Sequence, residues 1–324
     1  MESRAFSFAS SDGTELSVYK WWPERGIDVR AVVQIAHGMG EHAARYERVA
    51  ERLTSAGYGV CANDHRGHGR TAHAAGELGH IADNDSWNRA VRDIYDLNRR
   101  LRRDAPQAPI FLLGHSMGSL MVQQYLCEHA DTIDGAILSA SPGGAGVLRP
   151  LVMWLARIER WRLGRRERSE LLHRLLFGRF NRRFEPARTP YDWLSRDEQE
   201  VDAYVEDTLC GFVLSVQGIC DMLEALGPLA NPANLTRIPS DLPIYVLSGS
   251  EDPVHRDRSQ LTKLRRAYER AGLRRVTDRL YPGGRHEMFH ESNSGEVCDD
   301  LVEWLDQTLR EARDATTEEE SCSD

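Results

Sequence analysis

The pentapeptide Gly114-His115-Ser116-Met117-Gly118 places a serine hydroxyl between two glycines. The apolar run 109–113 before it predicts a buried strand, and the segment 119–126 after it predicts a helix. Strand, G-x-S-x-G and helix together are typical of a nucleophile elbow, a sharp turn that exposes the serine hydroxyl. The sequence therefore predicts Ser116 as a nucleophile; the alternative is a glycine-bounded turn with an incidental serine.

A serine hydroxyl is a weak nucleophile at neutral pH, so it needs an adjacent base and a carboxylate that orients the base. In the elbow fold, the acid precedes the histidine along the chain. Asp252 follows an apolar segment at 243–248 that predicts a strand, and a proline after it fixes a turn. We therefore predict Asp252 as the acid, with Glu251 as the alternative.

His286 lies in a glycine-rich loop after the last predicted strand, 275–281, and this position predicts it as the base. His290 is the alternative base. The segment 286–290 also matches H-E-x-x-H, the pattern by which one helical face binds zinc. Because proline and glycine at 282–284 favour a loop there, and no third ligand stands out, we predict no metal site and no cofactor.

A developing oxyanion needs backbone N–H donors, one from the residue after the nucleophile and one from a loop after an earlier strand. The first is the amide of Met117. The segment 37–42, His-Gly-Met-Gly-Glu-His, follows the strand predicted at 31–36 and supplies the second at Met39. The segment 64–69, Asp-His-Arg-Gly-His-Gly, carries reactive groups as well, but its glycines favour a tight structural turn.

The elements that position these residues alternate between strand and helix. A hairpin is predicted at 4–21, and strand–helix pairs follow up to the strand at 135–139. The rhythm stops over 143–238, where the patterns are helical and Ser195 with Glu198 suggests a capping box. It then resumes to about residue 313. This order predicts a mostly parallel sheet with helices on both faces and a helical cap inserted after the sixth strand.

The predicted boundaries are therefore a core of residues 1–142 and 239–313, a cap of residues 143–238, and a disordered acidic tail over 314–324. The chain has 324 residues and a net charge of −9, which argues against a nucleic-acid partner. Its six cysteines are scattered, no apolar run is long enough to span a membrane, and no secretory signal is visible. These features favour a cytoplasmic protein.

Together the motifs at 37–42, 64–69, 114–118, 250–254 and 284–287 resemble the monoacylglycerol lipase and lysophospholipase group of α/β-hydrolases (serine aminopeptidase S33-like hydrolases). The resemblance covers roughly residues 5–312. It implies an eight-stranded α/β-hydrolase core with a helical cap, and hydrolysis of single-chain glycerolipid esters through an acyl-enzyme. Ser119 departs from the group, which usually has a second glycine there.

Substrate binding is assigned to His115 and Gly38 in the core and to Leu155 and Ile158 in the cap. Residues 151–184 of the cap mix large apolar side chains with arginines. Such a pattern suits an apolar face that packs on the enzyme and lines an acyl tunnel, and it also suits peripheral contact with a membrane. The expected partner is a small lipid ester, and the protein is expected to be a monomer or a homodimer.

Rival functions remain open at this stage. A general carboxylesterase or an aminopeptidase could use the same scaffold, and the aminopeptidase would need cap carboxylates to hold a free amino terminus. A non-catalytic, hydrolase-like binding protein is the alternative from another class.

Overall fold

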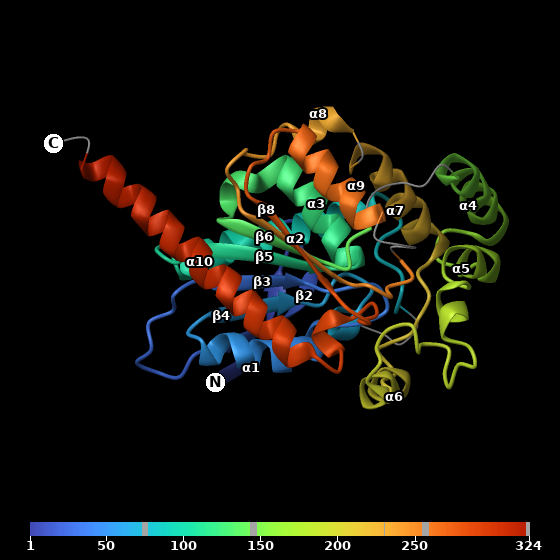
Figure 1. Cartoon of the computed structure of the whole chain (residues 1–324). Coiled ribbons are helices and arrows are strands. Elements are labelled where there is room, and N and C mark those ends of the chain that lie inside the picture. The colour runs from blue at the N-terminus through green and yellow to red at the C-terminus, as the bar shows by residue number, and fades with distance from the viewer. Residues whose placement is uncertain (73–76, 143–147, 230, 255–258, 322–324) are drawn as a thin grey trace.

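An eight-stranded sheet organises the computed structural model, which describes residues 1–72, 77–142, 148–229, 231–254 and 259–321 (Figure 1). The strand order is β1-β2-β4-β3-β5-β6-β7-β8. The pairs β1–β2 and β2–β4 are antiparallel and all the others are parallel. The strands are β1 (Glu2–Ala9), β2 (Glu15–Trp22), β3 (Val32–Ala36), β4 (Gly59–Asn63), β5 (Ile110–His115), β6 (Gly135–Ser139), β7 (Ile244–Gly249) and β8 (Val276–Tyr281). The predicted fold class is confirmed.

Helices cover both faces of the sheet because the side chains of its central strands alternate between two buried layers. Val33 and Ile35 of β3 pack with α1 (Glu47–Ser55) and α10 (Ser294–Ser321). Val32 and Ala36 of the same strand belong to the other layer, with α2 (Ser86–Asp104), α3 (Met117–His129) and α9 (Ser259–Arg270). Figure 1 shows α1 below the sheet, α10 crossing diagonally in front of the strands, and α3 and α9 above the sheet.

The cap region contributes the helices between β6 and β7, and the described residues of this segment form no strand. They are α4 (Arg149–Leu163), α5 (Glu170–Leu176), α6 (Glu198–Glu206), α7 (Val216–Leu229) and α8 (Pro232–Leu235). Short 3-10 helices are η1 (Ala43–Tyr46), η2 (Gly69–Thr71), η3 (Ala130–Thr132), η4 (Phe180–Phe184) and η5 (Met288–His290). Figure 1 shows α4, α5 and α6 beyond one end of the sheet.

The parallel strands end at a common edge, and this edge positions the site. The loops that follow β3, β5, β7 and β8 carry His37–His42, Ser116, Asp252 and His286, respectively. In an open α/β sheet the carboxyl ends of parallel strands form the crevice in which ligands bind. Along the described stretches of the chain, no helix has both the length and the apolar character needed to cross a bilayer.

Two local predictions are wrong. The segment 314–321, predicted as part of a disordered tail, continues α10; extending an existing helix avoids the cost of nucleation. The rest of the predicted tail, 322–324, lies outside the described residues. Ser195 is not the N-cap of α6: the Asp197 side chain accepts from the Gln199 amide at 3.0 Å, while the Ser195 hydroxyl donates to the His290 carbonyl.

Candidate active site

The nucleophile elbow is a strained turn between β5 and α3. Ser116 has φ +51° and ψ −114°, a conformation that L-residues rarely adopt. A Cβ atom at Gly114 would lie 2.6 Å from the Gly118 carbonyl oxygen, and one at Gly118 would lie 2.1 Å from the Ala36 carbonyl oxygen. Both glycines are therefore required by the close approach of α3 to β5 and β3. The Ser119 hydroxyl donates to the Ser116 carbonyl at 2.6 Å and supports the turn.

The three side chains predicted to act together meet at the sheet edge. His286 Nε2 lies 2.9 Å from Ser116 Oγ, and His286 Nδ1 lies 3.0 Å from both carboxylate oxygens of Asp252. Burial opposes a charge on His286, but the neighbouring Asp252 carboxylate outweighs it and raises the pKa of the imidazole above its usual value. The arrangement can take a proton from Ser116 and hold the imidazolium that results.

The alternative acid and base lie elsewhere. Glu251 is exposed, and its carboxylate pairs with Arg183 at 2.7 Å. His290 lies in η5, where its Nε2 is 3.0 Å from the Arg45 carbonyl oxygen. Burial and the nearby Arg45 charge lower the pKa of the His290 imidazole. Neither residue contacts Ser116.

The H-E-x-x-H segment does not form the helix that a zinc site of this pattern needs. His286 lies in the loop before η5 and bonds to Ser116, whereas His290 ends η5 and faces Arg45. Glu287 forms two hydrogen bonds with the Arg45 guanidinium, at 2.8 and 2.7 Å. His286 and His290 therefore bond to different residues and do not share one helical face.

The predicted oxyanion donors lie on the same cavity as the serine. Met117 is the first residue of α3, so its amide has no partner inside the helix. Across the described residues, neither the Met39 nor the Met117 amide donates to a protein acceptor. The loop that carries Met39 is held at Gly38, whose amide donates to Glu41, and at Gly40, whose carbonyl accepts from Gly211 and the Tyr204 hydroxyl.

A mostly apolar cavity of about 520 Å³ opens over Ser116 and His286. This volume falls within the usual range for small-molecule sites. Gly38 and His115 line the cavity, as predicted for substrate contact, and burial lowers the pKa of His115 to about 3, so its imidazole is neutral. Leu155 and Ile158 of α4 are not among the lining residues.

The apolar wall instead comes from α5, η4, α7 and two loops of the cap. Of these, α5 and η4 belong to the segment 151–184 for which the sequence suggested an acyl tunnel, whereas α7 and the loops were not singled out. Its largest members are Leu176, Phe177, Phe180, Trp193, Phe212, Met222, Leu223 and Leu226. Leu155 packs against the core layer instead, and Ile158 is 36% exposed. The spacing of Met222, Leu223 and Leu226 on one face of α7 is the signal that could have pointed to this wall.

The loop 64–69 packs against the loop that carries Met39, and none of its residues lines the cavity. The Arg66 guanidinium binds Asp93 at 2.6 Å and Asp12 at 2.8 Å. Complete burial lowers the pKa of His65 to about 3, which keeps the ring neutral over the working pH range. The His65 amide donates to the His37 ring and so fixes the start of the oxyanion loop.

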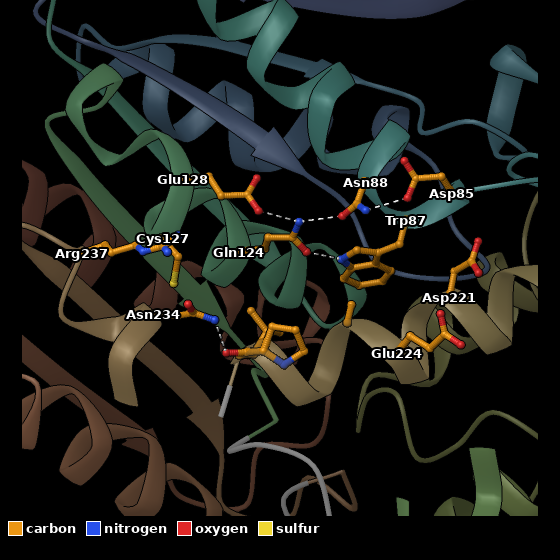
Figure 2. A pocket seen from close by; sticks show the side chains of 13 residues that line it. Asp85, Trp87, Asn88, Gln124, Cys127, Glu128, Asp221, Glu224, Asn234 and Arg237 are labelled. Carbon is orange, nitrogen blue, oxygen red and sulfur yellow. Dashed lines mark hydrogen bonds between the residues drawn. The ribbon is translucent and has the colours of Figure 1, made fainter. Parts of the chain in front are cut away.

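A second cavity, of about 310 Å³, lies between α2, α3, α7 and α8 (Figure 2). Its polar wall is a ladder in which the Trp87 indole donates to Gln124, and Gln124 donates to Asn88 and Glu128. Among the described residues that line it there is neither a serine nor a histidine. Ser116 and His286, the predicted nucleophile and base, line the first cavity instead.

Comparisons with known proteins find hydrolases of one family and related esterases. The family model described as serine aminopeptidase, S33, matches residues 27–293. The monoacylglycerol lipase of Mycolicibacterium smegmatis is 30% identical over 92% of this chain and 95% of its own length. The monoglyceride lipase of Mus musculus is 29% identical over 85% of this chain and 84% of its own. A carboxyl esterase of Bacillus coagulans, crystallised with glycerol, matches with a TM-score of 0.87 and 26% identity over 95% of this chain and 99% of its own.

Proposed function

The chain belongs to the serine aminopeptidase S33 family of α/β-hydrolases, and from this premise we propose that it is a serine esterase that cleaves monoacylglycerols or lysophospholipids. That the chain is an ester hydrolase follows from its relatives. The observation that supports a serine esterase for lipid substrates is the set of hydrogen bonds that links Ser116, His286 and Asp252 on the wall of an apolar cavity.

In the proposed mechanism Ser116 Oγ attacks the ester carbonyl while His286 Nε2 takes the hydroxyl proton. The amides of Met39 and Met117 stabilise the oxyanion, and Asp252 stabilises the imidazolium. His286 then protonates the leaving alcohol, which leaves the fatty acid bound as an ester of Ser116. A water molecule activated by His286 releases the acid and restores the serine.

The charge on the cavity wall favours an ester over a free amino terminus. Among the described lining residues the carboxylates are Glu41 and Glu287. Both bind the Arg45 guanidinium, at 2.8 and 2.7 Å, so neither is available to a substrate ammonium group. The cap acids that an aminopeptidase would use, Glu198, Glu200, Asp202, Glu206 and Asp207, lie outside the lining.

The test uses the purified protein, a p-nitrophenyl ester and a fluorophosphonate probe. We expect Ser116→Ala to abolish both hydrolysis and labelling, while Ser55→Ala, at the exposed end of α1, leaves both unchanged. Hydrolysis that survives in Ser116→Ala would refute the assignment of the nucleophile. Monoacylglycerols, lysophospholipids and aminoacyl amides, compared at equal concentration, then separate the esterase from the aminopeptidase.

We also propose peripheral contact of the cap with a lipid surface. Leu151, Trp154 and Trp161 of α4 are 55%, 60% and 87% exposed, and Leu171 and Leu175 of α5 are 54% and 47% exposed. The same two helices carry the exposed arginines Arg162 and Arg174. Helices of this kind bind anionic bilayers with the apolar face inward. In vesicle flotation with an anionic lipid, Trp161→Ala should reduce the bound fraction; Val205→Ala, an exposed apolar residue on α6, is the control. Equal binding by both variants would contradict the proposal.

A further inference from the structure

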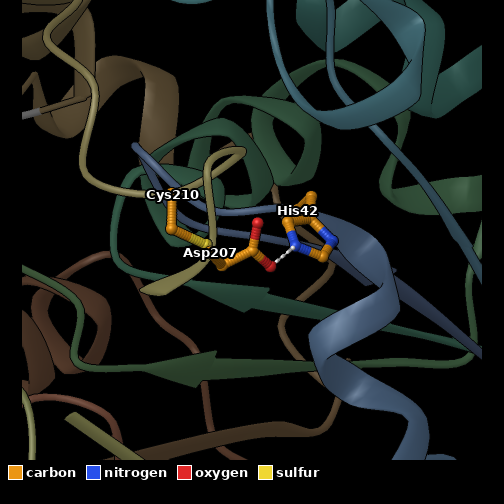
Figure 3. Close-up of side chains that lie close together, drawn as sticks. All are labelled: His42, Asp207 and Cys210. Carbon is orange, nitrogen blue, oxygen red and sulfur yellow. Dashed lines mark hydrogen bonds and ion pairs between the residues drawn. The ribbon is translucent and has the colours of Figure 1, made fainter. Parts of the chain in front are cut away.

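The segment that follows α6 lies on the loop that follows β3, and this contact joins cap to core. The Gly211 amide and the Tyr204 hydroxyl both donate to the Gly40 carbonyl, at 2.9 and 2.8 Å. The same contact brings Asp207 and Cys210, from the cap, to His42, from the core (Figure 3). The His42 ring is thus the core's part of a small polar cluster that exists only when the two segments meet.

The three side chains offer a nitrogen, an oxygen and a sulfur donor that all lie within 4.8 Å of one another. His42 Nε2 is 2.8 Å from Asp207 Oδ2. Figure 3 shows the Asp207 carboxylate between the Cys210 side chain and the imidazole. Bonds of about 2.0–2.3 Å to a tetrahedral zinc ion put its donors roughly 3.3–3.8 Å apart, so small side-chain shifts suffice to bring the cluster to that geometry.

The hydrogen bond between His42 and Asp207 does not explain why the Cys210 thiol lies beside these two side chains. Within the described part of the chain, the Cys210 thiol makes no hydrogen bond. A half-buried thiol that points at a carboxylate and an imidazole has the surroundings of a soft-metal ligand.

The local charge favours a cation. The carboxylates of Glu41, Glu287 and Asp207 lie around a single guanidinium, that of Arg45, which binds Glu41 and Glu287. Three carboxylates against one guanidinium make the surroundings of Cys210 negative, which favours a cation over an anion.

We propose that His42, Asp207 and Cys210 form a zinc-binding site that fastens the cap to the loop bearing Met39. As the Zn–S bond forms, the Cys210 thiol releases its proton to solvent. The proton that His42 Nε2 donates to Asp207 without metal leaves that nitrogen as the Zn–N bond forms, and the bound imidazole keeps one proton, on Nδ1. Asp207 supplies one carboxylate oxygen. Water takes the fourth position, and the Asp207 side chain, 33% exposed, marks the side from which it enters.

This site is distinct from the H-E-x-x-H segment and takes no part in the proposed ester hydrolysis. Its role is to hold two chain segments together. A bound ion would tie Asp207 and Cys210 to the loop in addition to the hydrogen bonds at Gly40, and so limit movement of this part of the cap relative to the oxyanion loop. The preferred ion is borderline or soft, because Mg²⁺ favours sites of oxygen donors alone.

The experiment titrates the purified full-length protein with Co²⁺ and then displaces the Co²⁺ with Zn²⁺. We expect one Co²⁺ per chain, with a near-ultraviolet charge-transfer band that reports a thiolate ligand, and loss of that band when Zn²⁺ is added. Cys210→Ser should remove the band and weaken Zn²⁺ binding by at least about tenfold, since even groups outside the metal's own ligand set contribute that much. His42→Ala should do the same.

Cys127→Ser is the matched control, because this half-buried thiol lines the second cavity instead. It should keep the band and the affinity. Circular dichroism of each variant checks that it is folded, and Asp207→Asn provides a third, conservative test of the ligand set. A parent protein without the thiolate band, or a band that persists in Cys210→Ser, would overturn the proposal and leave the cluster as a hydrogen-bonded contact.

Discussion

Replacing Glu287 by glutamine should destabilise the protein more than any change to a surface ion pair. The side chains of Arg45, Glu41 and Glu287 are 9%, 2% and 5% exposed, and Arg45 binds both carboxylates. Removing one partner of a buried pair costs about 3–5 kcal/mol. Because Glu41 remains bound to the guanidinium, we expect a loss near the lower end, about 3 kcal/mol. For a chain of 324 residues this corresponds to a fall in Tm of roughly 4–5 °C.

The assay is thermal and urea unfolding followed by circular dichroism. Asp104→Asn is the matched control, because Arg100 and Asp104 form an exposed pair one turn apart on α2 that is worth less than about 0.5 kcal/mol. The Arg45 charge holds the pKa of Glu287 well below its usual value although burial opposes this. A carboxyl whose folded pKa is depressed stabilises the fold above its unfolded pKa, about 4.3.

The difference between parent and Glu287→Gln should therefore be complete at pH 7 and shrink as the pH falls below that value. A Glu287→Gln protein that unfolds with the same midpoint as Asp104→Asn at pH 7 would refute the reasoning. A difference that grows on acidification would refute its electrostatic part.

Three further predictions concern the elbow, the base and the cavity. Gly118→Ala should cost at least about 1–3 kcal/mol in urea unfolding, because its Cβ would lie 2.1 Å from a backbone oxygen of β3, whereas Gly295→Ala, with open space around it, should not destabilise. The acidic limb of the kcat/KM profile should lie above pH 6.5, because the pKa of His286 is raised and its neutral form is the base; a limb below pH 6 would contradict this. Leu226→Trp should shift the acyl-chain preference toward shorter esters and Leu155→Trp should not, since only Leu226 lines the cavity, and equal profiles for the two variants would be evidence against this wall.

The sheet and the meeting of Ser116, Asp252 and His286 could be predicted because both depend on short patterns. Ser116 directly follows β5, and Asp252 and His286 lie in the loops after β7 and β8. The alternation of strands with helices puts the ends of these parallel strands at one edge. The prediction needed only the order of the elements and the turn residues at 114–118, 252–253 and 282–284. No long-range side-chain contact had to be known.

The cavity wall could not be predicted in the same way, since an apolar helical face does not reveal what it packs against. Leu155 has the spacing of a pocket residue, yet α4 turns it toward the core layer. Phe177, Trp193 and Phe212 reach the cavity from short helices and loops with no common period. The prediction for the tail is wrong for a related reason: a polar composition suggests disorder, whereas α10, anchored by the packing of Leu301 and Leu305, continues to Ser321.

The cap segment around Tyr204–Gly211 contacts the loop that carries Met39 and leads directly into the apolar wall of the cavity. Its hydrogen bonds to the Gly40 carbonyl hold the oxyanion loop, and the next residue, Phe212, forms part of the apolar wall. A movement of this segment would therefore change the space open to the acyl chain and release two hydrogen bonds on the loop that carries the Met39 amide. Residues that line the cavity and residues that hold the loop bearing Met39 lie on one continuous stretch of chain. If the proposed function holds, substitutions in this stretch should alter kcat together with KM.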